Sequence, residues 1–166
     1  MTGSRFFTCT YAPTAELSLV NSVHLNPADA RSAYVNIANC VYRAVPHASV
    51  ERGEIAMNAV QRRMARARVG GPVEVWEFMI PVSRPFTIGA VTIEARFLKT
   101  STTRIRDVAE LAAATKAALM GDVLTFGQSI VIKFFDSDIL LWIKSDVKGL
   151  VDEQTEIEID WRDDNV

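Results

Sequence analysis

The chain has 166 residues, of which about half are hydrophobic and 23% are charged, and its formal net charge is −2. This composition is ordinary for a folded chain of one domain or two small ones. It contains no run of the about 18 apolar residues that a membrane span needs. The first residues lack the apolar core and cleavage site of a signal peptide, so we expect a cytoplasmic protein. Cys9 and Cys40 are too few for a disulfide framework and are expected to be reduced and buried.

Short strands are predicted throughout the first half of the chain. Apolar residues alternate with polar ones in several segments, a pattern typical of half-buried strands. Turn-forming residues separate these segments, most clearly at 26–33. The predicted strands are 16–25 (around Leu17, Leu19 and Val23), 34–45 (as one strand followed by another strand or a hairpin), 53–58 and 73–80.

A short basic helix is predicted over residues 59–66. Asn58 is a suitable N-cap, and Val60 and Met64 lie four residues apart on one face. Arg62, Arg63 and Arg66 are then expected to point largely away from this apolar face. With Arg68, four arginines occur within seven residues. The net charge of residues 1–82 is only +2, which is too low for general nucleic acid binding. The cluster is therefore either a solvated face or a docking site for an anionic protein, because guanidinium groups pair well with carboxylates.

Residues 81–85 (PVSRP) are predicted to be a linker between a mainly β unit at 1–80 and a mixed unit at 86–166. The second unit is expected to bury Val108, Leu111, Ala112, Thr115 and Leu119 on one face of a helix. Asp107 and Glu110 resemble a capping box at its start, and Gly121 follows its end. The predicted strands are 86–98 (with a hairpin turn near Gly89), 129–135 and 139–145 (joined by a tight turn at 136–138), and 155–161.

Motifs typical of an enzyme are not found. The chain has no phosphate-binding glycine loop and no nucleophile elbow. His24 and His47 are expected to be structural, and Asp136 and Asp138 to form a turn rather than a metal site. The tryptophans are not interleaved with basic residues, as a base-stacking surface would require. What remains is the arginine cluster, with a weaker basic group at Lys99, Arg104 and Arg106.

Four segments, in this order, resemble the N-terminal domain of the N-ethylmaleimide-sensitive fusion protein (NSF) family. They are APTAELSLVNSVHLN (12–26), GEIAMNAVQRRMARARVGGPVEV (53–75), VTIEARFLK (91–99) and FGQSIVIKFFDSDILLWIKS (126–145). The similarity covers almost the whole chain. It implies a double-psi β-barrel followed by an α/β roll. The family's roll continues beyond the strand at 155–161, so we expect a fragment or a shortened roll.

The resemblance also implies a function. In this family the N-terminal domain has no catalytic activity, and ATP and magnesium bind to separate ATPase domains that form a hexamer. The N-terminal domain binds the acidic C-terminal region of soluble NSF attachment protein (SNAP), and through it SNARE complexes, which the ATPase takes apart. This chain would then be a cofactor-free, monomeric SNAP-docking domain that neither binds nucleic acid nor inserts into membranes. It would lie in the cytoplasm, peripheral to vesicle and Golgi membranes through its partners.

The family's docking residues match this sequence only in part. Its Gln-Arg-Lys helix is similar to Gln61, Arg62 and Arg63. An arginine of the family is replaced by Tyr11, and a lysine pair by Thr100 and Ser101. The expected partner-binding residues are therefore Arg62, Arg63, Arg66, Arg68, Lys99 and Arg104, the last two as substitutes for the lysine pair.

Two other functions remain open from the sequence. One is the N-terminal domain of a valosin-containing-protein-like ATPase, which shares the plan of two subdomains and binds ubiquitin-pathway adaptors. The other is a free-standing double-psi-barrel enzyme or nucleic acid binder, against which the lack of catalytic motifs and the net negative charge argue.

Overall fold

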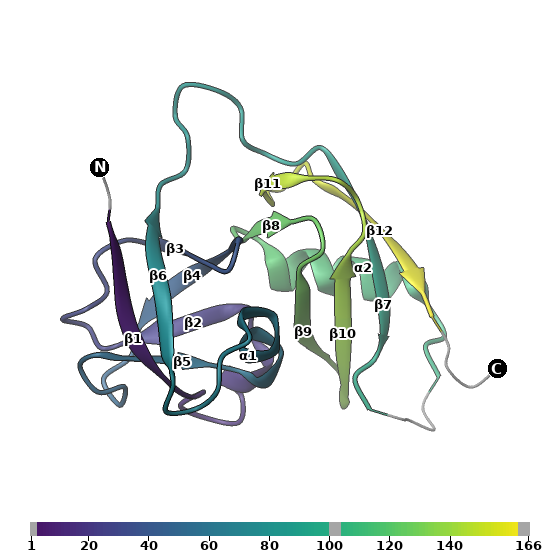
Figure 1. Ribbon diagram of the computed structural model, residues 1–166. Helices are drawn as coiled ribbons and strands as arrows, with labels where there is room; N and C mark the ends of the chain where they lie inside the picture. Colours follow the sequence, from purple (N-terminus) through teal and green to yellow (C-terminus); the bar gives the residue numbers. More distant parts are fainter. Residues whose placement is uncertain (1–2, 100–103, 163–166) are drawn as a thin grey trace. The chain divides into compact units, whose positions relative to one another are not determined.

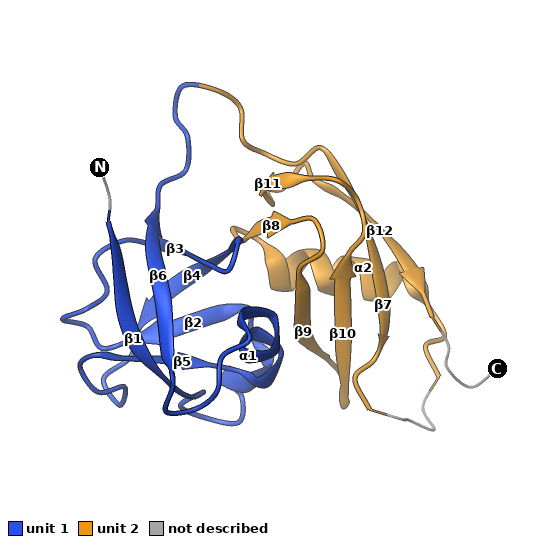
Figure 2. Cartoon of the chain, in the orientation of Figure 1, with its two compact units in different colours: residues 1–83 blue, residues 84–166 orange. Residues whose placement is uncertain are grey.

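The computed structural model describes residues 3–99 and 104–162, and the chain divides into two compact units, Met1–Ser83 and Arg84–Val166 (Figure 2). Both units are built mainly from β-strands, and each contains one α-helix. The predicted fold class, mainly β with α, is thus confirmed.

Unit 1 is a closed six-stranded barrel with the strand order β1-β5-β2-β4-β3-β6 (Figure 1). Strand β1 runs parallel to β5, and β2 runs parallel to β4, whereas the other pairs are antiparallel. This topology is consistent with a double-psi barrel. Its strands are β1 (Ser4–Tyr11), β2 (Ser22–Leu25), β3 (Tyr34–Ile37), β4 (Cys40–Pro46), β5 (Glu54–Met57) and β6 (Pro72–Phe78).

The barrel interior is filled by aliphatic side chains, by the aromatic rings of Phe7 and Tyr42, and by two thiols. Inward positions alternate along β3 and β6, as the pleat requires. Cys9 and Cys40 are both buried, and neither forms a disulfide, as predicted. The fully enclosed members of this core include Cys9, Val23, Leu25, Val35, Tyr42, Ile55 and Met57.

The hairpin between β3 and β4 confirms one of the sequence alternatives for 34–45. Its two loop residues, Ala38 and Asn39, have φ values of 50° and 68°. Positive φ at both loop positions gives a turn whose twist matches that of the strands. The strands at 53–58 and 73–80 are also present, as β5 and β6.

The prediction of one strand over 16–25 is wrong. A 3-10 helix, η1 (Leu17–Leu19), replaces its first half, and within 16–25 only Ser22–Leu25 forms a strand. Local hydrogen bonds decide this. The Leu17 N–H donates to Thr14 Oγ1 at 3.1 Å, and the Ser18 N–H donates to the Thr14 carbonyl at 3.1 Å. Such side-chain bonds compete with strand pairing. Strand β1, which the sequence did not predict, supplies the missing barrel member.

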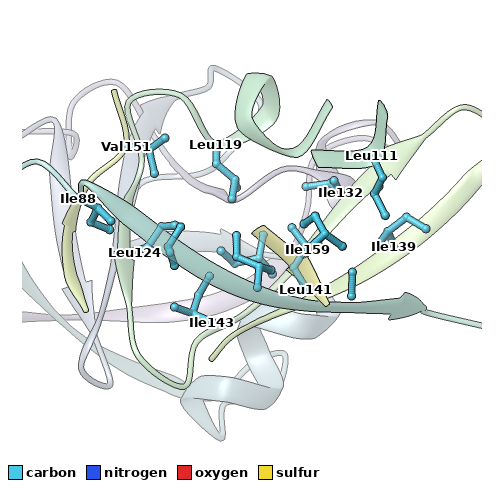
Figure 3. Close-up of a cluster of buried hydrophobic side chains, with 14 residues drawn as sticks. Ile88, Leu111, Leu119, Leu124, Ile132, Ile139, Leu141, Ile143, Val151 and Ile159 are labelled. Carbon is cyan, nitrogen blue, oxygen red and sulfur yellow. The ribbon is translucent and has the colours of Figure 1, made fainter. Parts of the chain in front are cut away.

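Unit 2 is a four-stranded sheet of order β12-β7-β10-β9, with helix α2 (Val108–Leu119) packed against it. A two-stranded sheet of β8 and β11 adjoins it. Figure 3 shows the core, where Leu111 and Leu119 of the helix meet sheet residues such as Ile139 and Leu141. The strands are β7 (Ala90–Phe97), β8 (Val123–Thr125), β9 (Ser129–Phe134), β10 (Ser137–Ile143), β11 (Lys148–Leu150) and β12 (Glu156–Trp161).

The local signals of helix α2 are largely confirmed. Asp107 is its N-cap and accepts the N–H groups of Ala109 and Glu110. Gly121, directly after the C-cap Met120, has a φ of 80°. Two details differ. The Val108 side chain is exposed rather than buried, and the bonds described at this helix start are those accepted by Asp107, without the return bond from the Glu110 side chain that a capping box has.

Two turn predictions in unit 2 are corrected. No hairpin forms at Gly89, because residues 86–88 bond to β11: the Ile88 N–H donates to the Leu150 carbonyl, and the Leu150 N–H to that of Phe86. The turn between β9 and β10 is also shorter than predicted, since only Phe135 and Asp136 separate the two strands.

Candidate functional site

The arginine cluster lies on and after a short helix, α1 (Ala59–Ala65), whose start is fixed by a capping box. Asn58 Oδ1 accepts the Gln61 N–H, and Gln61 Oε1 accepts the Asn58 N–H, both at 2.9 Å. Gln61 Nε2 also donates to the Ser22 carbonyl at 3.0 Å, so the helix is attached to the start of β2. Val60 is buried and Met64 packs against the barrel core, as predicted. Gln61 is buried too, which makes it a residue that holds the helix rather than one that meets a partner.

Arg62 is held in place by the barrel. Its Nη1 donates to the carbonyl of Met57, the last residue of β5. Its guanidinium carbon lies 5.1 Å from the centroid of the Tyr11 ring, a cation–π distance. The side chain is half-buried. Arg62 therefore points away from the apolar face, as predicted, but its position is fixed by two contacts.

Tyr11 occupies the position at which the resemblance places an arginine. Tyr11 pairs with Met57 in the parallel ladder of β1 and β5, and this register brings Tyr11 beneath Arg62. The ring is 65% exposed. No local signal in the sequence could have revealed this pairing, because the two residues are 46 positions apart. Tyr11 is thus an exposed aromatic residue of the site that sequence reasoning treated only as a lost charge.

The influence of Arg62 extends to Cys9 on β1. Burial raises the pKa of the Cys9 thiol, and the positive charge of Arg62 acts in the opposite direction. The net shift is upward, so the thiol stays protonated and behaves as a small buried hydrophobic group.

Arg63 and Arg66 are exposed at the C-terminal end of α1. Arg66 has left-handed backbone angles (φ 52°, ψ 35°), and its N–H donates to the Arg63 carbonyl. The next residue, Ala67, donates to the Arg62 carbonyl at 2.9 Å. This pair of bonds is a Schellman motif, which satisfies the last carbonyls of the helix. Positive side chains here are also favoured by the helix dipole.

Arg68 extends the cluster towards β6. The side chain is exposed and lies over Gly71: a Cβ on Gly71 would come within 3.1 Å of Arg68 Cγ. The loop itself is tied to β1, because Gly70 donates to the Cys9 carbonyl and Cys9 donates to the Gly71 carbonyl, both at 2.8 Å. Gly70 and Gly71 therefore form a turn that fixes the end of the basic stretch.

The four arginines of the cluster are electrostatically uncompensated. Within residues 3–99 and 104–162, none of them forms an ion pair. In unit 2, by contrast, Arg96, Lys144 and Arg162 each pair with Glu94 or Asp160 at 2.9–3.2 Å. Guanidinium groups without an ion pair keep donors for the carboxylates of another molecule, although one Nη1 donor of Arg62 already bonds to the Met57 carbonyl.

The other two predicted contact residues belong to unit 2. Lys99 is exposed two residues after the end of β7, and Arg104 is exposed ahead of α2. Arg104 and Arg106 border a small pocket together with Phe134 and Phe135. Thr100 and Ser101, which replace the family's lysine pair, lie outside the described residues.

His24 and His47 form a packed pair at one end of β2. Their rings meet edge to face with centroids 5.9 Å apart. His24 is buried, and burial lowers its pKa, with His47 adding to the effect. Nδ1 of His47 lies 2.7 Å from Ser49 Oγ within the following turn. This arrangement is consistent with structural histidines. Nowhere in the described parts of the chain do three or more His, Cys, Asp or Glu residues come together as a metal site would need.

Comparisons with known proteins point in one direction. No family model matches the chain. A vesicle-fusing ATPase from Arabidopsis thaliana is 31% identical over 153 residues, which covers 86% of this chain. The chain spans about a fifth of the length of that relative. In the described residues, neither helix is long and apolar enough to cross a membrane. The chain is therefore related, over most of its length, to part of a vesicle-fusing ATPase, as its sequence motifs predicted.

Proposed function

We propose that this chain is a non-catalytic adaptor-docking domain of a vesicle-fusing ATPase and that it binds the acidic C-terminal region of SNAP. The observation that carries the proposal is the set of uncompensated arginines on unit 1, in a chain related to such an ATPase. Arg62 and Arg63 are the main contacts. Arg66 and Arg68, and Lys99 and Arg104 on unit 2, add positive charge that steers the partner.

The two main arginines contribute differently. Arg62 is prepositioned by the Met57 carbonyl and the Tyr11 ring, so a carboxylate that binds it does not have to order a flexible side chain. Arg63 is exposed and supplies charge at a small cost in desolvation. Exposed ion pairs contribute only about 0.2–1 kcal/mol each. One domain therefore binds weakly, and several domains in a ring gain avidity.

The remaining functional assignments concern a longer parent protein. In that protein, separate domains hold ATP and magnesium and assemble as a hexamer, and hydrolysis drives the disassembly of SNARE complexes that SNAP carries. The parent acts in the cytoplasm and reaches vesicle and Golgi membranes through these partners.

The test is a titration of the chain with SNAP across a range of salt concentrations. Electrostatic docking predicts that affinity falls steeply between low and high ionic strength. Arg63→Glu, which alters an exposed side chain, is expected to weaken binding by about tenfold while leaving the fold unchanged. Arg62→Glu with Arg63→Glu is expected to abolish it.

A matched control is available in the same unit. Arg31→Glu with Arg52→Glu makes the same change in net charge at exposed positions outside the cluster. Equal losses from the control pair and the cluster pair would reduce the effect to overall charge and overturn the site. SNAP binding that is unaffected by salt and by both pairs would overturn the function. Capture of a ubiquitin-like adaptor in place of SNAP would instead support the valosin-containing-protein-like alternative.

A further inference from the structure

An open groove of about 500 Å³ lies on the surface of unit 1, beside the end of α1. Its apolar floor is formed by Ile37 and Val73 of the barrel and by Ala65 and Ala67. Its rim carries Asn36, Asn39, Glu74 and Trp76. The Trp76 side chain is 45% exposed, although it lies on a barrel strand. The groove is thus lined by a mixture of buried or half-buried apolar side chains and exposed or half-buried polar ones.

The groove exists because β3 and β6 separate. Their antiparallel ladder includes Asn36 opposite Trp76 and ends there. Two residues further along each strand, the next hydrogen-bonded pair in this register would place Ala38 opposite Glu74, but Ala38 has a φ of 50° and begins the hairpin turn. Strand β6 therefore continues to Pro72 along β1 without a neighbour on its other side.

The backbone of Glu74 faces this open side. Cys9 donates to Gly71 and accepts from Gly70, so β1 and β6 are hydrogen-bonded at this position. Hydrogen-bonded pairs alternate along an antiparallel ladder, so Phe7 and Val73, two residues further, form the next such pair. Glu74, one residue further, therefore directs its N–H and C=O away from β1. Trp76 does the same, and its backbone groups point towards β3. The Pro72 carbonyl points the same way, and its missing N–H costs no ladder bond. Two carbonyls and one N–H are thus available to an added strand.

The charge around the groove selects what would bind there. Arg66 and Arg68 alternate with the floor residues Ala65 and Ala67, and Arg68 lies over Gly71, next to Pro72. Neither arginine forms an ion pair with another described residue. Glu74, on the rim, supplies the opposite charge. A strand antiparallel to β6 would have its C-terminal end beside the arginines.

We propose that this groove binds an extended peptide segment of a protein partner, which adds to β6 at Glu74 and places acidic residues at its C-terminal end against Arg66 and Arg68. The ladder bonds give the segment its direction, as in other strand-addition complexes. Trp76 covers an apolar side chain of the peptide, and the amides of Asn36 and Asn39 bond to its polar groups. The inference does not depend on SNAP docking, whose main contacts are Arg62 and Arg63 and to which Arg66 and Arg68 add only steering charge.

The first experiment measures hydrogen exchange of the backbone amides in the free chain. The Glu74 N–H is expected to exchange at least tenfold faster than those of Val73 and Val75, which bond to β1. Slow exchange of the Glu74 N–H in the free chain would overturn the proposal, because it would show that the edge is already occupied.

The second experiment uses the blocked peptide acetyl-Val-Thr-Val-Thr-Asp-Asp-amide, followed by NMR of the chain. Binding is expected to shift the Glu74 and Trp76 signals and to slow exchange of the Glu74 N–H. N-methylation of alternate peptide residues distinguishes strand addition from loose contact. Methylating the residues that face β6 is expected to weaken binding at least tenfold, whereas methylating the others leaves it unchanged. Equal binding by both methylated peptides would overturn the ladder.

Charge reversal tests the assigned arginines. Arg66→Glu with Arg68→Glu is expected to lower the affinity for the acidic peptide at least tenfold and to raise the affinity for a peptide ending in Lys-Lys. The control pair, Arg31→Glu with Arg52→Glu, is expected to have less than a twofold effect. SNAP binding measured on the same variants keeps the two proposals apart: loss of SNAP binding with Arg62→Glu and Arg63→Glu but intact peptide binding supports two separate sites. If peptide binding is lost with Arg62→Glu and Arg63→Glu but not with Arg66→Glu and Arg68→Glu, the groove is not the peptide's site.

Discussion

The guanidinium group of Arg62 lies over the ring of Tyr11 at 5.1 Å while it donates to the Met57 carbonyl. The same side chain thus bridges β1 and β5, two strands that pair in parallel. A residue proposed as a docking contact is therefore also part of the structure that holds the barrel together, and variants at this position have to be interpreted with both roles in mind.

Arg62→Ala is expected to destabilise the chain by about 1–2 kcal/mol, because it removes a charge-assisted hydrogen bond and a cation–π contact. Arg63→Ala, at an exposed position, is expected to change stability by less than about 0.5 kcal/mol. Chemical denaturation of the two variants measures this difference. A double-mutant cycle of Tyr11→Ala and Arg62→Ala isolates the ring contact, for which we expect about 0.5–1 kcal/mol of coupling. Equal stabilities for Arg62→Ala and Arg63→Ala would contradict the assignment.

Arg66→Gly is expected to have opposite effects on stability and on binding. The left-handed conformation costs a residue with a side chain about 1 kcal/mol relative to glycine, so the substitution stabilises the folded state. Glycine also raises the conformational entropy of the unfolded chain, which offsets part of this gain. The expected net gain is about 0.5 kcal/mol in thermal or chemical unfolding. Binding of the acidic hexapeptide is expected to fall, because one guanidinium is lost. Arg66→Ala serves as the control, since it removes the charge without relieving the backbone.

Gly149→Ala is expected to be strongly destabilising, whereas Gly89→Ala is not. A Cβ at Gly149 would lie 2.5 Å from the Phe86 carbonyl oxygen, a backbone atom that also bonds to Leu150. A Cβ at Gly89 meets no atom within 4 Å. Overpacking of this kind costs about 1–3 kcal/mol or more. The melting temperatures of the two purified variants provide the comparison, and similar values would refute the close approach of β11 to residues 86–88.

Stability is expected to fall as the pH decreases below about 6.5, partly through His24. Its pKa is lowered in the folded state, so the unfolded chain takes up the proton first. The stabilisation is complete above the ordinary histidine pKa, and it is lost progressively until the pH passes below the folded value. Free energies of unfolding measured from pH 8 to pH 5 test this. His24→Gln is expected to flatten the curve in that window, and an unchanged curve would exclude His24 as the cause.

Sequence reasoning succeeded where structure is decided locally. Asn58, Asp107 and Gly121 act at helix ends through hydrogen bonds or backbone angles within a few residues, and each was predicted from its type and position. The prediction of a strand over 16–25 failed because hydrogen bonds to Thr14 redirect the backbone there, and hydrophobic alternation does not contain that information. The three-residue strands β8 and β11 are too short to produce a periodic signal.

The candidate site was predicted in its charge but not in its geometry. The cluster and its helix could be recognised from the sequence. The fixed position of Arg62 and the role of Tyr11 depend on the parallel register of β1 and β5, which no short segment encodes. The groove likewise depends on where the ladder of β3 and β6 ends. Long-range pairing therefore decides which arginines are anchored and which are free.

The closed barrel also has a consequence for synthesis of the protein. Strand β1 is synthesised well before its partners, because β5 and β6 begin only at Glu54 and Pro72. During synthesis β1 therefore remains unpaired until most of unit 1 has emerged from the ribosome. Pairing over such sequence distances makes folding slow, and the exposed strand is vulnerable to association until β6 closes the ring. The same residues that bring Tyr11 beneath Arg62 are thus among the last of unit 1 to reach their final pairing.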